Sequence, residues 1–173
     1  MRLLQPQEQY KESFIEAIKE FQSNDPLGRY VDLDAEDIDK NFSSYIAKLD
    51  AESKGIDLLE GRVPQTTYWL IDNDEFIGRV RIRHSLNDTL MKIGGHIGYD
   101  IRPSQRKKGY GKAILRLALP LAKELGIDNA LITCDVTNIA SRKVIEANGG
   151  KLEDTVPDGN NTLDKYRFWI KID

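Results

Sequence analysis

The sequence has little cysteine and histidine and no long apolar run. Of its 173 residues, one is cysteine (Cys134) and two are histidine. A single cysteine excludes a disulfide within the chain, and without a cluster of cysteine and histidine a zinc site is not expected. Met1 to Leu4 lead at once into polar residues, so neither a signal peptide nor a membrane span is predicted. These features favour a protein of the reducing cytoplasm.

Positive charge is not in excess either. The 25 lysines and arginines are outnumbered by 28 aspartates and glutamates, giving a net charge of −3, so general nucleic-acid binding is not expected. What the chain does have is enough apolar residues, 40%, for a substantial core. The length suits one domain, predicted to span residues 1–173.

Apolar periodicity and turn signals predict an alternation of strands and helices. Apolar residues recur at helical spacing over 7–21, from Asp34 to about residue 49, and over 109–125 and 137–148. Strands are predicted at 1–4, 66–72, 75–84, 92–101, 129–136, 151–156 and 165–172. The fold class is therefore α/β, with a mixed, mostly antiparallel sheet of six to seven strands flanked by about four helices. The strands 92–101 and 129–136 are expected to run parallel, because a helix connects them.

The connections between these elements carry turn residues. Pro26 and Gly28 are expected to end the first helix, and residues 53–65 read as a loop. Asn73 and Asp74 predict a hairpin turn, and "PDGNN" (157–161) predicts the turn between the last two strands.

A basic turn that contains glycine precedes the helix 109–125. Residues 106–111 read Arg-Lys-Lys-Gly-Tyr-Gly. The first N–H groups of a helix lack intrahelical partners and carry the positive end of its dipole, so this position favours an anion such as phosphate. A P-loop is excluded because Arg106 and Ala113 replace its first glycine and its hydroxyl residue. A dinucleotide-binding fingerprint is excluded because Ile114 replaces its third glycine.

The turn and its flanks resemble the GNAT superfamily of N-acetyltransferases. The family signature Gln/Arg-x-x-Gly-x-Gly/Ala, which holds the pyrophosphate of acetyl-coenzyme A, matches 106–111, and "IGYDIRPSQR" before it resembles the family's strand and turn. Downstream, "NIASRKVIEANGG" (138–150) resembles the family's Asn-x-x-Ala/Ser helix. The likeness covers roughly residues 1–173 and is strongest over 95–150.

The resemblance implies a GNAT fold and an enzyme with acetyl-coenzyme A as co-substrate. Such an enzyme transfers the acetyl group, by direct attack, to a primary amine of a small molecule or polypeptide. It implies neither a nucleic-acid nor a membrane partner, and it is compatible with a homodimer. The acceptor cleft is expected beside the first two helices and the loop 53–65, whose sequence does not identify the acceptor.

The resemblance also assigns the cofactor-binding residues. Backbone N–H groups at Tyr99 and Ile101 would bind the pantetheine arm and polarise the thioester carbonyl. Glycines 94, 95 and 98 fit a strand that bulges there. The residues assigned to the phosphates are Arg106, Lys107, Lys108, Gly109, Tyr110, Gly111 and Lys112. Asn138 and Ser141 correspond to the pair that contacts the cofactor or its thiol, with simple helix capping as the alternative.

Proton transfer needs a base for the amine and a donor for the departing thiolate. His96 is the predicted base because of its intrinsic pKa and because alternation along 92–101 puts it on one face with Gly98 and Asp100. A purely structural histidine remains the alternative. Asp100 and Asp135 are further candidates for the base, each with a capping role as its alternative.

The proton donor departs from the family pattern. Many members carry tyrosine seven residues after the motif asparagine, and here that position is Ile145. We predict that Tyr166 takes its place, with water or Ser141 as the other donor and a packing role for Tyr166 as the alternative. Because Ile145 replaces the usual tyrosine, a catalytically silent acyl-coenzyme A-binding regulatory module is the alternative function. A plain α/β interaction domain would bind no coenzyme A.

Three arginines, Arg79, Arg81 and Arg83, alternate along the strand 75–84 and so share one face. The favoured interpretation is a solvated face paired with carboxylates. The alternative is an anion site for an acidic acceptor. Trp69 and Cys134 are predicted to lie in the core.

Overall fold

The computed structural model describes residues 1–25, 29–159 and 163–173. Within them, the strands are β1 (Arg2–Leu4), β2 (Gln65–Asp72), β3 (Glu75–Arg83), β4 (Ile97–Ile101), β5 (Asn129–Asp135), β6 (Lys151–Val156) and β7 (Lys165–Lys171). The α-helices are α1 (Lys11–Asn24), α2 (Ala35–Lys40), α3 (Phe42–Ser53), α4 (Tyr110–Glu124) and α5 (Ile139–Ala147). Single turns lie at Glu8–Tyr10, Leu90–Gly94 and Pro103–Gln105. The predicted fold class, mixed α/β with seven mostly antiparallel strands, is confirmed.

The strands form two sheets, ordered β1-β2-β3-β4 and β5-β7-β6, and within the described residues the ladders between neighbouring strands are antiparallel. The hairpin between β2 and β3 turns at Asn73 and Asp74, with φ of 48° and 60°. Two left-handed residues in succession match the twist of the flanking strands, which is why this two-residue loop makes a tight hairpin. The hairpin predicted from the sequence is confirmed.

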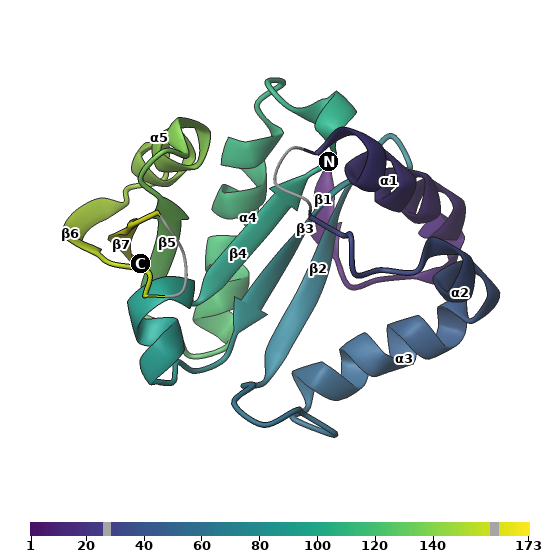
Figure 1. Cartoon of the computed structure of the whole chain (residues 1–173), viewed down its shortest axis with the longest axis horizontal. Helices are drawn as coiled ribbons and strands as arrows, with labels where there is room; N and C mark the ends of the chain where they lie inside the picture. The colour runs from purple at the N-terminus through teal and green to yellow at the C-terminus, as the bar shows by residue number, and fades with distance from the viewer. Residues whose placement is uncertain (26–28, 160–162) are drawn as a thin grey trace.

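β4 and β5 are the edge strands of the two sheets, and they meet only near the start of β4. Gly95 forms a bridge with Ile132, and the backbone N–H of His96 donates to the carbonyl oxygen of Leu131 at 2.7 Å. Beyond this contact the two strands separate (Figure 1). The prediction that β4 and β5 form a parallel ladder is therefore wrong. The edge of β4 that faces β5 is open instead.

The strand expected to begin at Lys92 begins only at Ile97. Leu90–Gly94 form a π-helical turn instead, which the N–H of Gly95 closes onto the carbonyl of Leu90 at 2.6 Å. Gly95 has φ 67° and ψ −179°, a region that essentially only glycine occupies. A Cβ at this position would lie 2.5 Å from the carbonyl oxygen of Leu131. This glycine therefore turns the chain next to β5 rather than extending β4.

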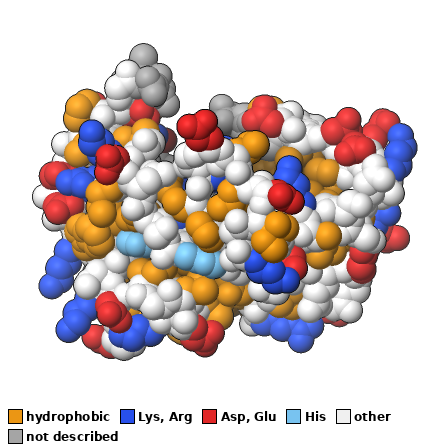
Figure 2. Space-filling model, turned by 90° about the horizontal axis from the view of Figure 1, so that it is seen from below, with side chains coloured by type: hydrophobic (Ala, Val, Ile, Leu, Met, Phe, Trp, Pro, Cys, Tyr) orange, Lys and Arg blue, Asp and Glu red, His pale blue; other side chains and the backbone are white. Residues whose placement is uncertain are grey.

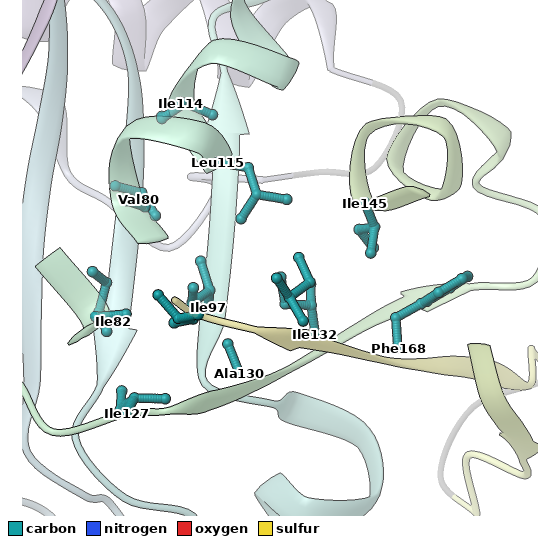
Figure 3. Packing of buried hydrophobic residues seen from close by; sticks show 14 of the residues in the cluster. Val80, Ile82, Ile97, Ile114, Leu115, Ile127, Ala130, Ile132, Ile145 and Phe168 are labelled. Carbon is teal, nitrogen blue, oxygen red and sulfur yellow. The ribbon is translucent and has the colours of Figure 1, made fainter. Parts of the chain in front are cut away.

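One hydrophobic core joins the two sheets beneath α4 and α5. Helical spacing in α4 buries Ile114, Leu115 and Ala118, which pack with β-branched residues of β3, β4 and β5 (Figure 3). Fully burying such a side chain contributes about 1.5–3 kcal/mol. The shared core fixes β4 and β5 relative to the starts of α4 and α5.

The other face of the first sheet is covered by α1, α2 and α3 (Figure 1). Phe14 of α1 stacks on Trp69 with ring centroids 4.4 Å apart, and Trp69 is fully buried, as predicted. Asp34 caps α2 by accepting hydrogen bonds from two N–H groups, also as predicted. The single helix expected after Asp34 is instead two, because the chain breaks at Asn41.

The remaining turn predictions differ in outcome. α1 extends to Asn24, so it ends later than the pattern suggested, and the Pro26 and Gly28 signals lie outside the described residues. Part of the predicted turn at 157–161 also lies outside them. In the described part of the chain, no helix has the length and apolarity needed to cross a membrane.

Candidate active site

The turn before α4 presents a row of unpartnered backbone donors. Lys107 and Gly109 have φ of 62° and 89°, so the chain twice takes a left-handed conformation as it enters the helix. Among the described residues, none accepts a hydrogen bond from the backbone N–H groups of 107–111. These five neighbouring donors lie at the positive end of the α4 dipole, which is the arrangement that binds phosphate.

Two side chains of this turn hold it in place rather than pointing into it. Arg106 pairs with Asp25 at the end of α1, 2.9 Å away, and its Nε donates to the carbonyl of Ile101 at 3.1 Å. Burial opposes ionisation of Asp25, but hydrogen bonds from Arg29 and Arg106 outweigh it and keep the pKa of this carboxyl well below its ordinary value. The hydroxyl of Tyr110 donates to Asp72 at 2.8 Å. Within the described ranges, the side chains of Lys107 and Lys112 have no hydrogen-bond or ion-pair partner, and Lys108 donates to Gln105 at 2.9 Å.

The two glycines of the motif serve different purposes. Gly109 adopts φ 89°, and a Cβ there would have no heavy atom within 4 Å. Gly111 lies where α4 approaches α5, and a Cβ would come within 3.1 Å of Cγ2 of Val144. Gly109 thus permits the backbone conformation of the turn, whereas Gly111 permits close packing of the two helices.

The open edge of β4 carries the second set of free donors. In the ladder between β3 and β4, Gly98 lies opposite Arg81 and Asp100 lies opposite Arg79. On either side of these pairs, the N–H of Arg83 donates to the carbonyl of His96, and the N–H of Arg102 donates to the carbonyl of Ile77. These bonds fix which residues of β4 are hydrogen-bonded to β3. In an antiparallel ladder, the N–H groups of the intervening residues point away from the partner strand. The N–H groups of Tyr99 and Ile101 therefore point toward the gap between β4 and β5.

A polar cluster spans this gap at the start of α5. The hydroxyl of Tyr99 lies 3.0 Å from Oγ of Ser141, and the side chain of Asn138 accepts the N–H of Ser141 at 3.0 Å. Cys134 of β5 is 7% exposed and interacts with Ser141. Burial raises the pKa of Tyr99 to about 12, and burial with the nearby charge of Asp135 raises the pKa of Cys134 to about 11. At neutral pH both groups therefore keep their protons.

His96 precedes β4, so the expectation that it shares a strand face with Gly98 and Asp100 is wrong. Its Nδ1 accepts the backbone N–H of Leu131 at 3.0 Å. Burial, and then the charge of Arg83, lower the pKa of His96. A neutral ring whose Nδ1 accepts a hydrogen bond carries its proton on Nε2. His96 thus joins β5 to the π-turn, and its role as base stays a prediction.

The two histidines lie at the end of the molecule away from the start of α4. Figure 2 shows them at the surface, among hydrophobic side chains. His84 accepts or donates a hydrogen bond with Thr66 at 2.8 Å. Neither carboxylate candidate for the base is unpaired. Asp100 bonds Arg79 at 3.1 Å and Asp135 pairs with Lys165.

Tyr166 and Ile145 both lie on the side of the second sheet that faces α5. Tyr166 stands opposite Cys134 in the β5–β7 ladder, and the guanidinium of Arg142 lies 5.2 Å from its ring centroid. Ile145 is fully buried and points from α5 into the core beside Phe168 (Figure 3). A core position explains why this residue is apolar, and the catalytic role of Tyr166 stays a prediction.

Two features of the site could not be predicted from the sequence. The contact of the Tyr99 hydroxyl with Ser141 joins residues 42 positions apart, so strand and helix periodicity do not predict it. The ion pair of Asp25 with Arg106 joins residues 81 positions apart along the chain, and no local pattern indicates it.

The geometry thus places a helix start with free N–H groups beside a gap between two sheets, and comparisons with known proteins indicate the family. The family model described as "Acetyltransferase (GNAT) domain" matches residues 5–151. The chain belongs to the GNAT acetyltransferase family. No curated protein sequence matches it.

Solved structures share the fold at low sequence identity. RimL, a ribosomal L7/L12 alpha-N-protein acetyltransferase in complex with coenzyme A, is 18% identical with a TM-score of 0.69, over 99% of this chain and 93% of that one. The microcin C7 self-immunity acetyltransferase MccE, in complex with acetyl-CoA and AMP, is 16% identical with a TM-score of 0.68, over 98% and 91%. RimJ of Mycobacterium smegmatis, in complex with CoA-disulfide, is 19% identical with a TM-score of 0.70, over 98% and 80%.

Proposed function

We propose that this protein transfers the acetyl group of acetyl-coenzyme A to a primary amine, with residues 1–173 acting as one acetyltransferase domain. The observation that carries the proposal is the alignment of two sets of free backbone donors. One set, at residues 107–111, begins α4, and the other, at Tyr99 and Ile101, lines the open edge of β4. A pyrophosphate joined to an extended arm with amide groups fits both sets at once.

When bound, acetyl-coenzyme A would supply an activated acyl group as its thioester. The chain's own contribution is positioning and charge. The turn before α4 holds the phosphates, with Lys107 and Lys112 adding positive charge. The N–H groups of Tyr99 and Ile101 orient the arm and donate to the acyl oxygen.

The pair Tyr99 and Ser141 is assigned as the proton donor to the departing thiolate. Their hydroxyl oxygens lie 3.0 Å apart and span the gap beside the β4 edge. Tyr166, the residue predicted from the sequence, stands on β7, which is separated from the gap by β5. A donor must reach the sulfur directly or through one water, and the Tyr99–Ser141 pair is nearer to the edge that would hold the arm.

The base that deprotonates the amine is drawn from His96, Asp100 and Asp135. Each has a hydrogen-bond or ion-pair partner in the structure, so each would have to exchange that partner to take up a proton. The acceptor is a small molecule or a polypeptide. Relatives in fold include RimL, an alpha-N-protein acetyltransferase of ribosomal L7/L12, and MccE, a microcin C7 self-immunity acetyltransferase.

Two measurements test the function. Calorimetry should show binding of coenzyme A in the micromolar range, and a free-thiol assay with acetyl-coenzyme A and a panel of amines should show turnover that depends on the amine. Binding without turnover on any amine would favour the regulatory module instead. Absence of binding would favour the interaction domain.

A further inference from the structure

β3 carries three arginines on the face of the first sheet that α1, α2 and α3 cover. Arg79 is the ladder partner of Trp69, whose ring packs in the aromatic cluster under those helices. Arg81 and Arg83 follow at two-residue spacing and share this face. The face lies on the opposite side of the sheet from α4, so these arginines are not part of the turn that would bind phosphate.

The three guanidinium groups are not equally neutralised. Arg79, 13% exposed, pairs with Asp100 at 3.1 Å and lies 4.3 Å from the ring centroid of Tyr30, so the predicted solvated face is wrong for this residue. Arg83 donates to the carbonyl oxygens of Gly94 and Gly95 at 3.2 and 2.8 Å. These two arginines fix the loop after α1 and the π-turn, respectively.

Arg81 has no partner of this kind. Among the described residues none accepts a hydrogen bond from it, none forms an ion pair with it, and its Nε is buried. The charge of Arg79, and then burial, lower the pKa of Arg81. Burial and the charge of Arg81 lower the pKa of Arg83 to about 10. A partly buried guanidinium without a hydrogen-bond or ion-pair partner favours an anionic group beside it.

Arg81 lies close to the open edge of β4. Its ladder partner is Gly98 of β4, where a Cβ would have no heavy atom within 4 Å. Gly98 is the neighbour of Tyr99, whose N–H lines the open edge. The absence of a side chain at residue 98 leaves room above β4 between Arg81 and that edge.

We propose that Arg81 binds a carboxylate of the acceptor, so that the acceptor is an amine carrying an acidic group near the nitrogen that is acetylated. The carboxylate would belong to a free amino acid or to an acidic residue close to the N-terminus of a polypeptide. A guanidinium binds a carboxylate through two parallel hydrogen bonds, which selects for this group as well as attracting it. This inference rests on the proposed function of the same site.

The first test uses a probe that does not depend on knowing the acceptor. The protein, saturated with coenzyme A, is titrated with glutarate at constant ionic strength, and its Tm is followed. Wild type and Arg116→Gln, a variant of an exposed arginine on α4, should show the same increase in Tm. Arg81→Gln should lose that increase. Equal responses in all three proteins would overturn the proposal.

The second test measures acceptor preference. Alanine is compared with alaninamide, and the C-terminally amidated peptide Ala-Asp-Ala with the amidated Ala-Asn-Ala, in the free-thiol assay. The acidic member of at least one pair should have a kcat/KM at least about tenfold higher, and Arg81→Gln should abolish the difference while keeping coenzyme A affinity. The pair that shows the preference identifies the source of the carboxylate.

The outcomes separate this inference from the proposed function. Loss of coenzyme A binding or of all turnover in wild type would contradict the function, and the glutarate titration, repeated without coenzyme A, would still decide the role of Arg81. Turnover with equal preference for acidic and neutral acceptors would contradict the inference and leave the function intact. Arg81→Gln removes a repulsion with Arg79, so its Tm without ligand should not fall.

Discussion

The hydroxyl oxygen of Tyr99 on β4 lies 3.0 Å from the hydroxyl oxygen of Ser141 on α5, and the two side chains span the gap between the sheets. This contact is made across 42 positions of sequence. It connects the strand that would orient the thioester with the helix whose start would face the sulfur. In the proposed function, these two hydroxyls return a proton to the departing thiolate.

Ser141→Ala should lower kcat by about ten- to a hundredfold with little change in coenzyme A affinity, because only the departing thiolate needs the proton. Tyr166→Phe should change kcat by less than about threefold. Steady-state kinetics with Tm as the folding control measures both. A large loss in Tyr166→Phe with an unaffected Ser141→Ala would restore the assignment of the donor made from the sequence.

The phosphate turn is tested best at Gly109, because a side chain at Gly111 would meet Val144. Gly109→Asp and Gly109→Asn have nearly the same shape, and both residues tolerate a left-handed backbone. The aspartate variant should bind coenzyme A at least about tenfold more weakly than the asparagine variant, since its carboxylate repels the phosphates. Calorimetry gives the two Kd values. Equal affinities would mean that the phosphates bind elsewhere.

Gly95→Ala should destabilise the protein by about 3 kcal/mol or more, because it combines a strained φ with a Cβ 2.5 Å from the carbonyl oxygen of Leu131. Gly98→Ala is the matched control, since a Cβ there meets nothing within 4 Å. Its free energy of unfolding should change by no more than about 0.5 kcal/mol. Urea unfolding measures both variants, and a similar loss in the two would contradict the role of Gly95 at the junction.

The thiol of Cys134 should react slowly. With a pKa of about 11, roughly one molecule in a thousand carries the thiolate at pH 8, and the fraction rises about tenfold with each unit of pH up to 11. Alkylation by iodoacetamide, followed by mass spectrometry, should show this rise. Coenzyme A should slow the reaction, because its arm would lie beside Ser141. Fast labelling at pH 7 that ignores coenzyme A would place Cys134 outside the gap.

His96 should make stability depend on pH below neutrality. Burial lowers its pKa in the folded state, so the unfolded chain binds more protons below about pH 6.5. The stabilising contribution is therefore complete above that pH and is lost as the pH falls. The decrease in Tm between pH 7.5 and 5.0 should be smaller in His96→Gln than in wild type. An equal decrease would mean that the ring titrates normally.

The same variant bears on catalysis. If His96 is the base, His96→Gln should lower kcat by about a hundredfold and remove the corresponding limb of the pH–rate profile. If its Nδ1 serves only to hold Leu131, the profile should keep its shape while Tm falls. The two readouts separate proton transfer from positioning.

The sequence by itself determined the order of the elements, the hairpin at Asn73 and Asp74, the cap at Asp34 and the basic turn before α4. Each of these depends on neighbouring residues, through apolar period, turn propensity or the needs of a helix start. The separation of β4 from β5 was decided by the tertiary structure alone. Whether a glycine such as Gly95 extends a strand or turns it depends on the carbonyl of Leu131, which approaches from another strand.

The same distinction holds for the site. The sequence could place Tyr99, Ser141 and Cys134 on their elements, but their meeting across the gap follows from packing α4 and α5 on one core. Arg79, Arg81 and Arg83 could be placed on one face by strand period. Arg79 is paired by Asp100 and Arg83 by the carbonyls of the π-turn, whereas Arg81 has no such partner. Only the tertiary structure decided this, because hydrogen-bond partners are set by proximity in space rather than along the chain.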